Sequence, residues 1–194
     1  MLRKEKYVKK PTDYIIGYQH IEKLLAQESS RACVIIFAAK IEELLEKILR
    51  KYLVSATTKV DDLLDGDAPL ATFSAKIRVA YRIGLIDITF VRALDLIRKT
   101  RNAFAHDIED CTLTDEPHKS RVRELAELLR KSPAFPLWKK TFFANRPDGE
   151  SDFFASTAYV LLRLDKIYLA IDPLDADKSY VLLPDEFLCD ESEA

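Results

Sequence analysis

Helical periodicity constrains the fold of this chain more than any other feature of its sequence. Over residues 29–53 the apolar residues recur every three or four positions, which predicts one long helix with a single buried face. The residues of that face are Val34, Phe37, Ala38, Ile41, Leu44, Leu45, Ile48 and Leu49. Helical patterns also occupy residues 12–27, 72–83, the stretch from 88 to 106, 119–132 and 151–171. Such faces are buried only when helices pack against one another.

The residues that interrupt these patterns indicate where the helices begin and end. Ser29 or Ser30 is expected to cap the long helix, Thr72 or Ser74 the short helix that follows, and Asp87 the next one. Gly84 stands where a left-handed C-cap belongs. Ser151 is expected to cap the last helix.

The sequence predicts an all-α protein. Only 4 of its 194 residues are glycine, which disfavours folds built on many tight turns, and the stretch YVLLP at 180–184 is too isolated to begin a sheet. We expect a single helical bundle over residues 12–172, which includes a helical C-terminal extension. A basic tail at residues 1–11 and an acidic tail at 173–194 are expected to flank it.

Charge and hydropathy exclude several classes of function. The chain has 30 Lys and Arg against 32 Asp and Glu, whereas a protein that grips duplex DNA usually shows a basic excess. No helix-turn-helix with a basic recognition helix stands out. No stretch approaches the roughly 18 apolar residues of a membrane span, and the charged N-terminus is not a secretory signal. We therefore expect a cytoplasmic protein without a membrane partner and without direct DNA binding.

The cysteines and histidines argue against a metal site, a cofactor or a disulfide framework. Cys33, Cys111 and Cys189 form no CxxC pair and are expected to be reduced thiols. The three histidines, at positions 20, 106 and 118, are equally scattered. We predict no metal and no cofactor.

Aromatic and basic residues alternate in the stretch LWKKTFF, residues 137–143. Trp138, Phe142 and Phe143 could stack on nucleic-acid bases beside Lys139 and Lys140. The favoured interpretation is that the rings belong to the core and the lysine stems lie along apolar surface.

The hexapeptide RNAFAH, residues 101–106, contains the side chains best suited to chemistry. Arg101 falls in an apolar stripe, and a buried guanidinium needs a partner because it stays charged. One interpretation is structural: Arg101 pairs with Glu42 or Glu46 (or with Glu43) of the long helix. Asn102 and His106 are four residues apart and share the adjacent helix face.

The second interpretation is catalytic. The pattern Arg101, Asn102, three further residues and His106 resembles the R-x4-H motif of HEPN domains, helical bundles in which dimerisation forms a ribonuclease cleft. The resemblance implies that His106 would assist proton transfer from a ribose hydroxyl, and that Arg101 would stabilise charge on the phosphate. The activity implied is a metal-independent endoribonuclease, resembling a toxin, with RNA as its substrate.

A longer resemblance overlaps this motif. The segments LLDGDAPLATFSAKIRVAYRIGLI, residues 63–86, and DLIRKTRNAFAHD, residues 95–107, resemble the mannitol operon repressor family. The resemblance implies an all-α cytosolic regulator of sugar-alcohol uptake and use, without an element that reads DNA. Under this resemblance we expect a transcriptional repressor and not an enzyme. It is expected to act mainly through a regulatory or transcription-related protein partner and to form a homodimer.

Overall fold

The structure is a computed structural model that describes residues 28–106, 111–132 and 134–174. These residues form six helices and no strand, which confirms the predicted all-α class. The helices are α2 (Ser30–Tyr52), α3 (Phe73–Arg82), α4 (Ile88–His106), α5 (His118–Leu129), α6 (Ala134–Phe142) and α7 (Asp148–Ala170). The helix expected at 12–27, the tail at 1–11 and all but the first two residues of the tail at 173–194 lie outside the described residues. In the part described, a membrane-spanning helix of sufficient length and hydropathy is not found.

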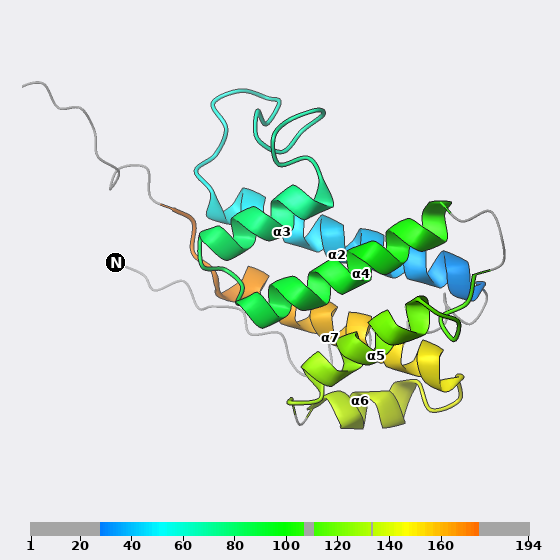
Figure 1. Cartoon of the computed structure of the whole chain (residues 1–194). Coiled ribbons are helices and arrows are strands. Elements are labelled where there is room, and N and C mark those ends of the chain that lie inside the picture. The colour runs from blue at the N-terminus through cyan, green and yellow to red at the C-terminus, as the bar shows by residue number, and fades with distance from the viewer. Residues whose placement is uncertain (1–27, 107–110, 133, 175–194) are drawn as a thin grey trace, which may run out of the picture.

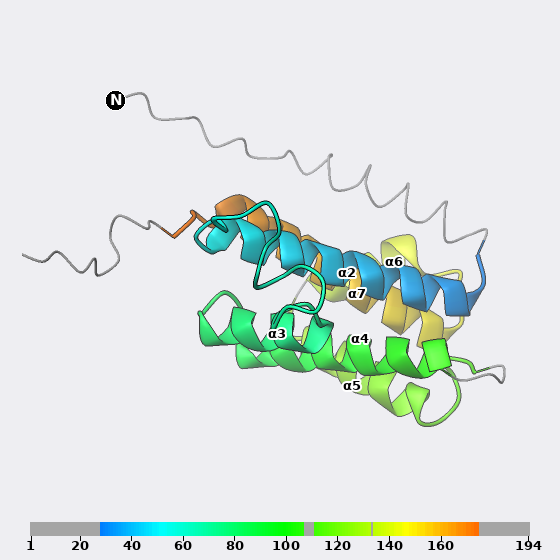
Figure 2. The ribbon, with the colours of Figure 1, turned by 90° about the horizontal axis from the view of Figure 1, so that it is seen from above.

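Four of the helices close a ring around the core. α2 packs against α7 and α4, and α5 packs against the same two helices (Figure 1). Seen from above, α2 and α7 lie together on one side, and α3, α4 and α5 lie on the other (Figure 2). α3 is held against α2 and α4, whereas α6 is held against α7. The result is a four-helix bundle with one short helix added at each side.

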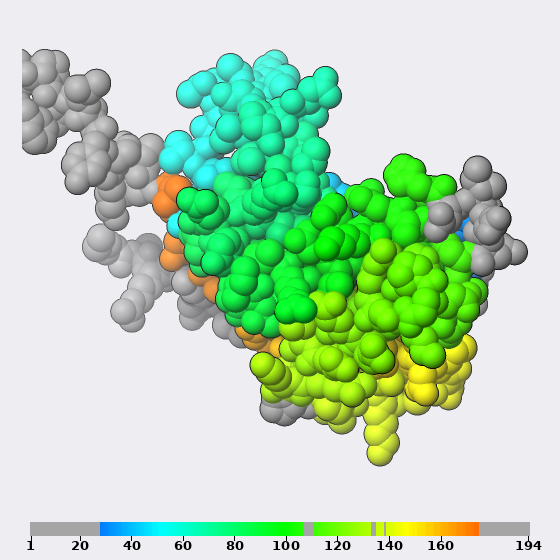
Figure 3. All heavy atoms as spheres, in the orientation of Figure 1, coloured from blue at the N-terminus to red at the C-terminus, as the bar shows by residue number. Residues whose placement is uncertain are grey.

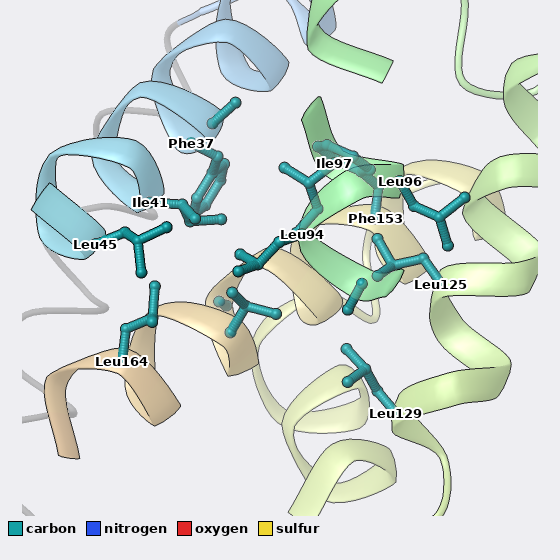
Figure 4. Close-up of a cluster of buried hydrophobic side chains, with 14 of the residues drawn as sticks. Phe37, Ile41, Leu45, Leu94, Leu96, Ile97, Leu125, Leu129, Phe153 and Leu164 are labelled. Carbon is teal, nitrogen blue, oxygen red and sulfur yellow. The ribbon is translucent and has the colours of Figure 1, made fainter. Parts of the chain in front are cut away.

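The apolar faces predicted from the sequence meet inside this ring. Figure 4 shows side chains from α2, α4, α5 and α7 pointing into one cluster. Its fully buried members include Phe37, Ile41, Leu45, Leu94, Ile97, Phe153 and Leu164. Burying side chains of this size stabilises the fold by about 1.5–3 kcal/mol each. The periodic spacing of the apolar residues therefore specifies which face of each helix is buried.

Local capping sets the starts of three helices. The side chains of Ser29 and Thr72 each accept a hydrogen bond from the backbone amide three residues later, at 3.2 Å. Asp87 Oδ1 accepts one in the same way at 2.8 Å. These contacts satisfy backbone donors that have no partner within the helix. The caps predicted at these positions are confirmed.

The turn between α3 and α4 depends on Gly84. Its φ is +76°, a left-handed conformation that favours glycine. The Leu85 amide donates to the Ala80 carbonyl at 2.9 Å, and the Gly84 amide donates to the Tyr81 carbonyl at 3.0 Å. This pair of bonds is a Schellman motif, and it directs the chain from the end of α3 back along the bundle as α4.

The last two helices differ from what the sequence predicted: no helix was expected at residues 134–142, where α6 lies, and α7 begins before its predicted cap. Ser151 was predicted as the cap of α7, and this was wrong: the helix starts at Asp148 and is preceded by Pro147. Pro147 accepts the Ser151 amide at 2.8 Å through its carbonyl, which places Ser151 within the first turn. α6 includes Pro136 in its own first turn, where a missing amide costs no helical hydrogen bond.

Candidate functional site

Arg101 of the RNAFAH segment contacts the long helix. Its Nη2 atom lies 3.0 Å from Glu42 Oε2, so α4 is tied to α2 by an ion pair. The side chains of Arg101 and Glu42 are 30% and 22% exposed. Glu46, the other suggested partner, pairs instead with Lys76 and Arg50. Glu43 binds Lys40 and Lys47 at the surface of α2.

Lys76 is the central cation of this region. It lies on α3 with a side chain only 5% exposed, and its Nζ atom is 2.7 Å from Glu46 Oε2 and 3.4 Å from Glu42 Oε1. A buried ammonium group requires such partners, because leaving it unpaired would cost several kcal/mol. Lys76 thus joins α3 to two carboxylates that lie one turn apart on α2.

Arg50 extends the cluster from α2 to the loop that follows. Its guanidinium donates to Glu46 Oε1 from Nε at 3.0 Å and from Nη2 at 2.9 Å. Nη1 lies 3.0 Å from Asp61 Oδ2, and Nη2 contacts Asp65. The loop at residues 53–72 projects from the bundle in Figures 1 and 3, and Arg50 fixes its base. The ion-pair network comprises Arg101, Glu42, Lys76, Glu46, Arg50, Asp61 and Asp65.

Two carboxyl groups of the network, those of Glu46 and Asp65, have a lowered pKa. Burial acts to raise the pKa of Glu46, but hydrogen bonds from Lys76 and Arg50 outweigh it and hold this pKa below its usual value. The pKa of Asp65 is lowered by a hydrogen bond from the Asp61 backbone and by Arg50. Both groups therefore stay ionised at neutral pH and keep the loop, α2 and α3 connected.

Lys76 and Arg50 were not predicted as site residues, although the sequence carries a signal for both. Lys76 falls between Phe73, Ile77 and Ala80 on the buried side of its helix, as Arg101 does on α4. The argument that a charge in an apolar stripe needs a partner applies to it equally. Arg50 follows Glu46 by four residues, a spacing at which helical side chains meet.

The remaining residues of the RNAFAH segment do not gather around Arg101. Five residues of α-helix turn by about 140°, so His106 and Arg101 project from different sides of α4. His106 is exposed at the end of the helix, and Asn102 is half-buried. Within the described residues, neither side chain makes a hydrogen bond or ion pair. A single copy of the chain does not assemble these three groups into one cleft.

A groove of about 430 Å³ lies between α4 and α5, on the face shown in Figure 3. Its apolar lining residues are Ile88, Val91 and Leu96, and Ile88 is 62% exposed. Its charged residues are balanced: Arg92 and Lys99 against Asp95 and Glu124. The lining therefore combines apolar side chains with equal numbers of positive and negative ones.

The titratable groups of the described residues do not form a metal site. No three His, Cys, Asp or Glu side chains among them are placed to hold an ion. The thiol of Cys33 lies in the core, where burial raises its pKa. Cys189 lies outside the described residues. His118 is buried and packs edge-on against the ring of Phe104, with centroids 4.9 Å apart.

Comparisons with known proteins identify the fold and the family. The structure resembles that of the MtlR–HPr complex from Escherichia coli, with a TM-score of 0.56 and 19% identity, over 77% of this chain and 98% of that one. It also resembles a possible transcriptional regulator, YggD, from Shigella flexneri, with a TM-score of 0.54 and 14% identity, over 86% and 100% of the two chains. No curated protein sequence matches the chain. The family model described as mannitol repressor matches residues 18–146, which include the projecting loop and the entire ion-pair network, and the chain therefore belongs to the mannitol repressor family.

Proposed function

We propose that this protein represses transcription of genes for mannitol or another sugar alcohol by contacting a second protein. Membership of the mannitol repressor family supports the regulatory role. One structural neighbour was solved as a complex of MtlR with HPr, which makes HPr the first partner to test. In this proposal the chain contributes a binding surface and no recognition helix of its own.

The observation that favours a protein partner over nucleic acid is the pairing of the arginines on α4. Each of the three is engaged by a carboxylate of the same chain, in the pairs Arg92–Glu124, Arg98–Asp95 and Arg101–Glu42. A phosphate backbone would have to compete with these carboxylates for each guanidinium. Nucleic-acid affinity depends mainly on cations that are available to phosphates. α4, the helix that carries the RNAFAH segment, is therefore poorly suited to binding DNA or RNA.

The groove between α4 and α5 is the surface we assign to the partner. Ile88 lines the groove and is 62% exposed, so a partner that covers the groove would bury this apolar side chain. Its charges cancel, so the complementary surface is expected to be apolar with mixed charges. A strongly acidic or strongly basic partner surface would gain little electrostatic attraction from this groove.

Calorimetric titration with HPr from Escherichia coli tests this assignment. Ile88→Asp is expected to weaken binding at least tenfold, because it places a charge where the unaltered chain presents an apolar side chain to the partner. Leu137→Asp is the matched control, since Leu137 is 65% exposed on α6, away from the groove. Equal losses in both variants would reject the groove, and absence of binding by the unaltered chain would reject HPr. A sequence-specific shift of operator DNA by the chain alone at physiological salt would overturn the protein-contact mechanism.

The proposed assembly is a homodimer. Light scattering coupled to size-exclusion chromatography should give a mass near twice the 22.2 kDa of one chain. A monomer at the concentrations used for partner binding would remove dimerisation from the proposal.

The endoribonuclease interpretation makes a different prediction about RNA. Because Glu42 engages Arg101, and His106 projects elsewhere on α4, we expect structured and single-stranded RNA to stay intact in EDTA with the unaltered chain. His106→Ala should behave identically in gel electrophoresis. Cleavage by the unaltered chain that is lost in His106→Ala would favour catalysis by Arg101, Asn102 and His106.

A further inference from the structure

A second cavity lies beside α6, on the opposite side of the bundle from the projecting loop (Figure 1), and most of the charged residues in its lining are basic. It measures about 330 Å³ and is lined by residues from the end of α5, from α6 and from the start of α7. Four basic residues line it: Arg130, Lys139, Lys140 and Arg146. The one carboxylate in the lining, Asp148, has a side chain that is 99% exposed. This cavity thus differs from the charge-balanced groove between α4 and α5.

Part of this positive charge is already neutralised within the chain. Lys139 Nζ lies 3.0 Å from Asp152 Oδ1 and 3.5 Å from Asp148 Oδ1, and Arg146 Nη1 lies 3.4 Å from Glu150 Oε2. Arg130 and Lys140 are exposed and form no ion pair with another described residue. The cavity therefore retains an excess of positive charge.

Ser151 provides an independent indication of a ligand. The residue lines the cavity and is only 2% exposed, yet its Oγ atom has no hydrogen-bond partner among the described residues. An unsatisfied buried hydroxyl destabilises the folded state, so native structures usually provide it with a partner. Ser151 lies in the first turn of α7, whose N-terminus has no side-chain cap. The start of a 23-residue helix attracts negative charge through its backbone amides.

We propose that this cavity binds the phosphate group of a small phosphate-bearing molecule. Arg130 and Lys140 would supply charge, and Ser151 would donate its hydroxyl hydrogen to a phosphate oxygen. Phe135 and Pro136 form an apolar part of the lining, suited to the body of a phosphomonoester. The volume fits the lower end of small-molecule sites. Free phosphate and a phosphomonoester share the chemistry recognised, so both are used as probes.

The test is a calorimetric titration of the full chain with inorganic phosphate and with phenyl phosphate. Saturable binding is expected for both. Tighter binding of phenyl phosphate would identify a phosphomonoester as the preferred ligand. Lys140→Gln and Ser151→Ala should each raise the Kd at least fivefold. Lys99→Gln is the matched control, because Lys99 is an exposed cation that lines the other groove. It should leave the Kd unchanged.

A second measurement separates binding from folding. Because the Ser151 hydroxyl has no hydrogen-bond partner in the described part of the chain, Ser151→Ala should keep or increase the free energy of unfolding in urea. A Kd that Ser151→Ala leaves unchanged would overturn the proposal, as would equal weakening by Lys99→Gln or the absence of saturable binding. The proposal stands apart from the partner assignment, which Ile88→Asp tests on another face.

Discussion

Replacing Phe154 with alanine is expected to destabilise the bundle by about 3–5 kcal/mol, the usual range for truncating a buried aromatic side chain. Phe154 lies on α7 and is fully buried. Its ring centroid is 5.6 Å from that of Phe37 on α2 and 5.7 Å from that of Phe153. The Arg146 guanidinium lies 4.9 Å from the same centroid. Alanine would leave a cavity at the point where α7 meets α2.

Urea unfolding followed by circular dichroism measures this loss. Leu137→Ala removes an apolar side chain that is 65% exposed, and its effect should stay within about 0.5 kcal/mol. Comparing the two variants also tests whether α7 is part of the core. The family match does not address this, because it ends at residue 146, before α7 begins. A loss below about 1 kcal/mol for Phe154→Ala would mean that α7 contributes little to the core.

Periodicity made five of the six described helices and their buried faces predictable, and α6 is the exception. The stripe through Phe37, Ile41 and Leu45 needed only the 3.6-residue repeat, and that face is buried in the structure. Caps at Ser29, Thr72 and Asp87 were predictable because each side chain bonds an amide only three residues away. Features that depend on contacts near in sequence are therefore the ones that the sequence specifies most directly.

The candidate sites depend on contacts between distant residues. That Lys76 needs a partner follows from its own helix, but the choice of Glu46, 30 residues earlier, follows from how α3 packs on α2. The cationic cavity combines Arg130 of the α5 end with Lys140 of α6 and Ser151 of α7. In sequence these are ordinary charged and polar residues, and only the packing of three helices brings them together. The start of α7 was mispredicted because Ser151 has the side chain of a cap but sits inside the helix.

Replacing Lys76 with methionine should destabilise the protein by about 2–4 kcal/mol, because it removes one partner from a buried pair and leaves the carboxylates behind. Methionine keeps most of the aliphatic volume of lysine, so the loss of stability measures what the charge contributes. Arg101→Met should cost only about 1 kcal/mol, since Arg101 is 30% exposed and water screens its pair. Lys40→Met is the control, because Lys40 is 62% exposed and its pair with Glu43 lies in solvent. Urea unfolding at pH 7 gives all three values.

The stability lost in Lys76→Met should depend on pH, and this dependence identifies its electrostatic origin. The pKa of Glu46 is lowered in the folded protein, so the stability that this carboxylate contributes is present above its ordinary pKa and is lost as pH falls through the folded value. Without Lys76 the folded pKa of Glu46 should rise, and the variant then has less stability to lose on acidification. The difference between the two proteins should therefore shrink from pH 7 to pH 3. A deficit that is constant with pH, or no larger than that of Lys40→Met, would show that Lys76 acts through packing and that charge does not tie α3 to α2.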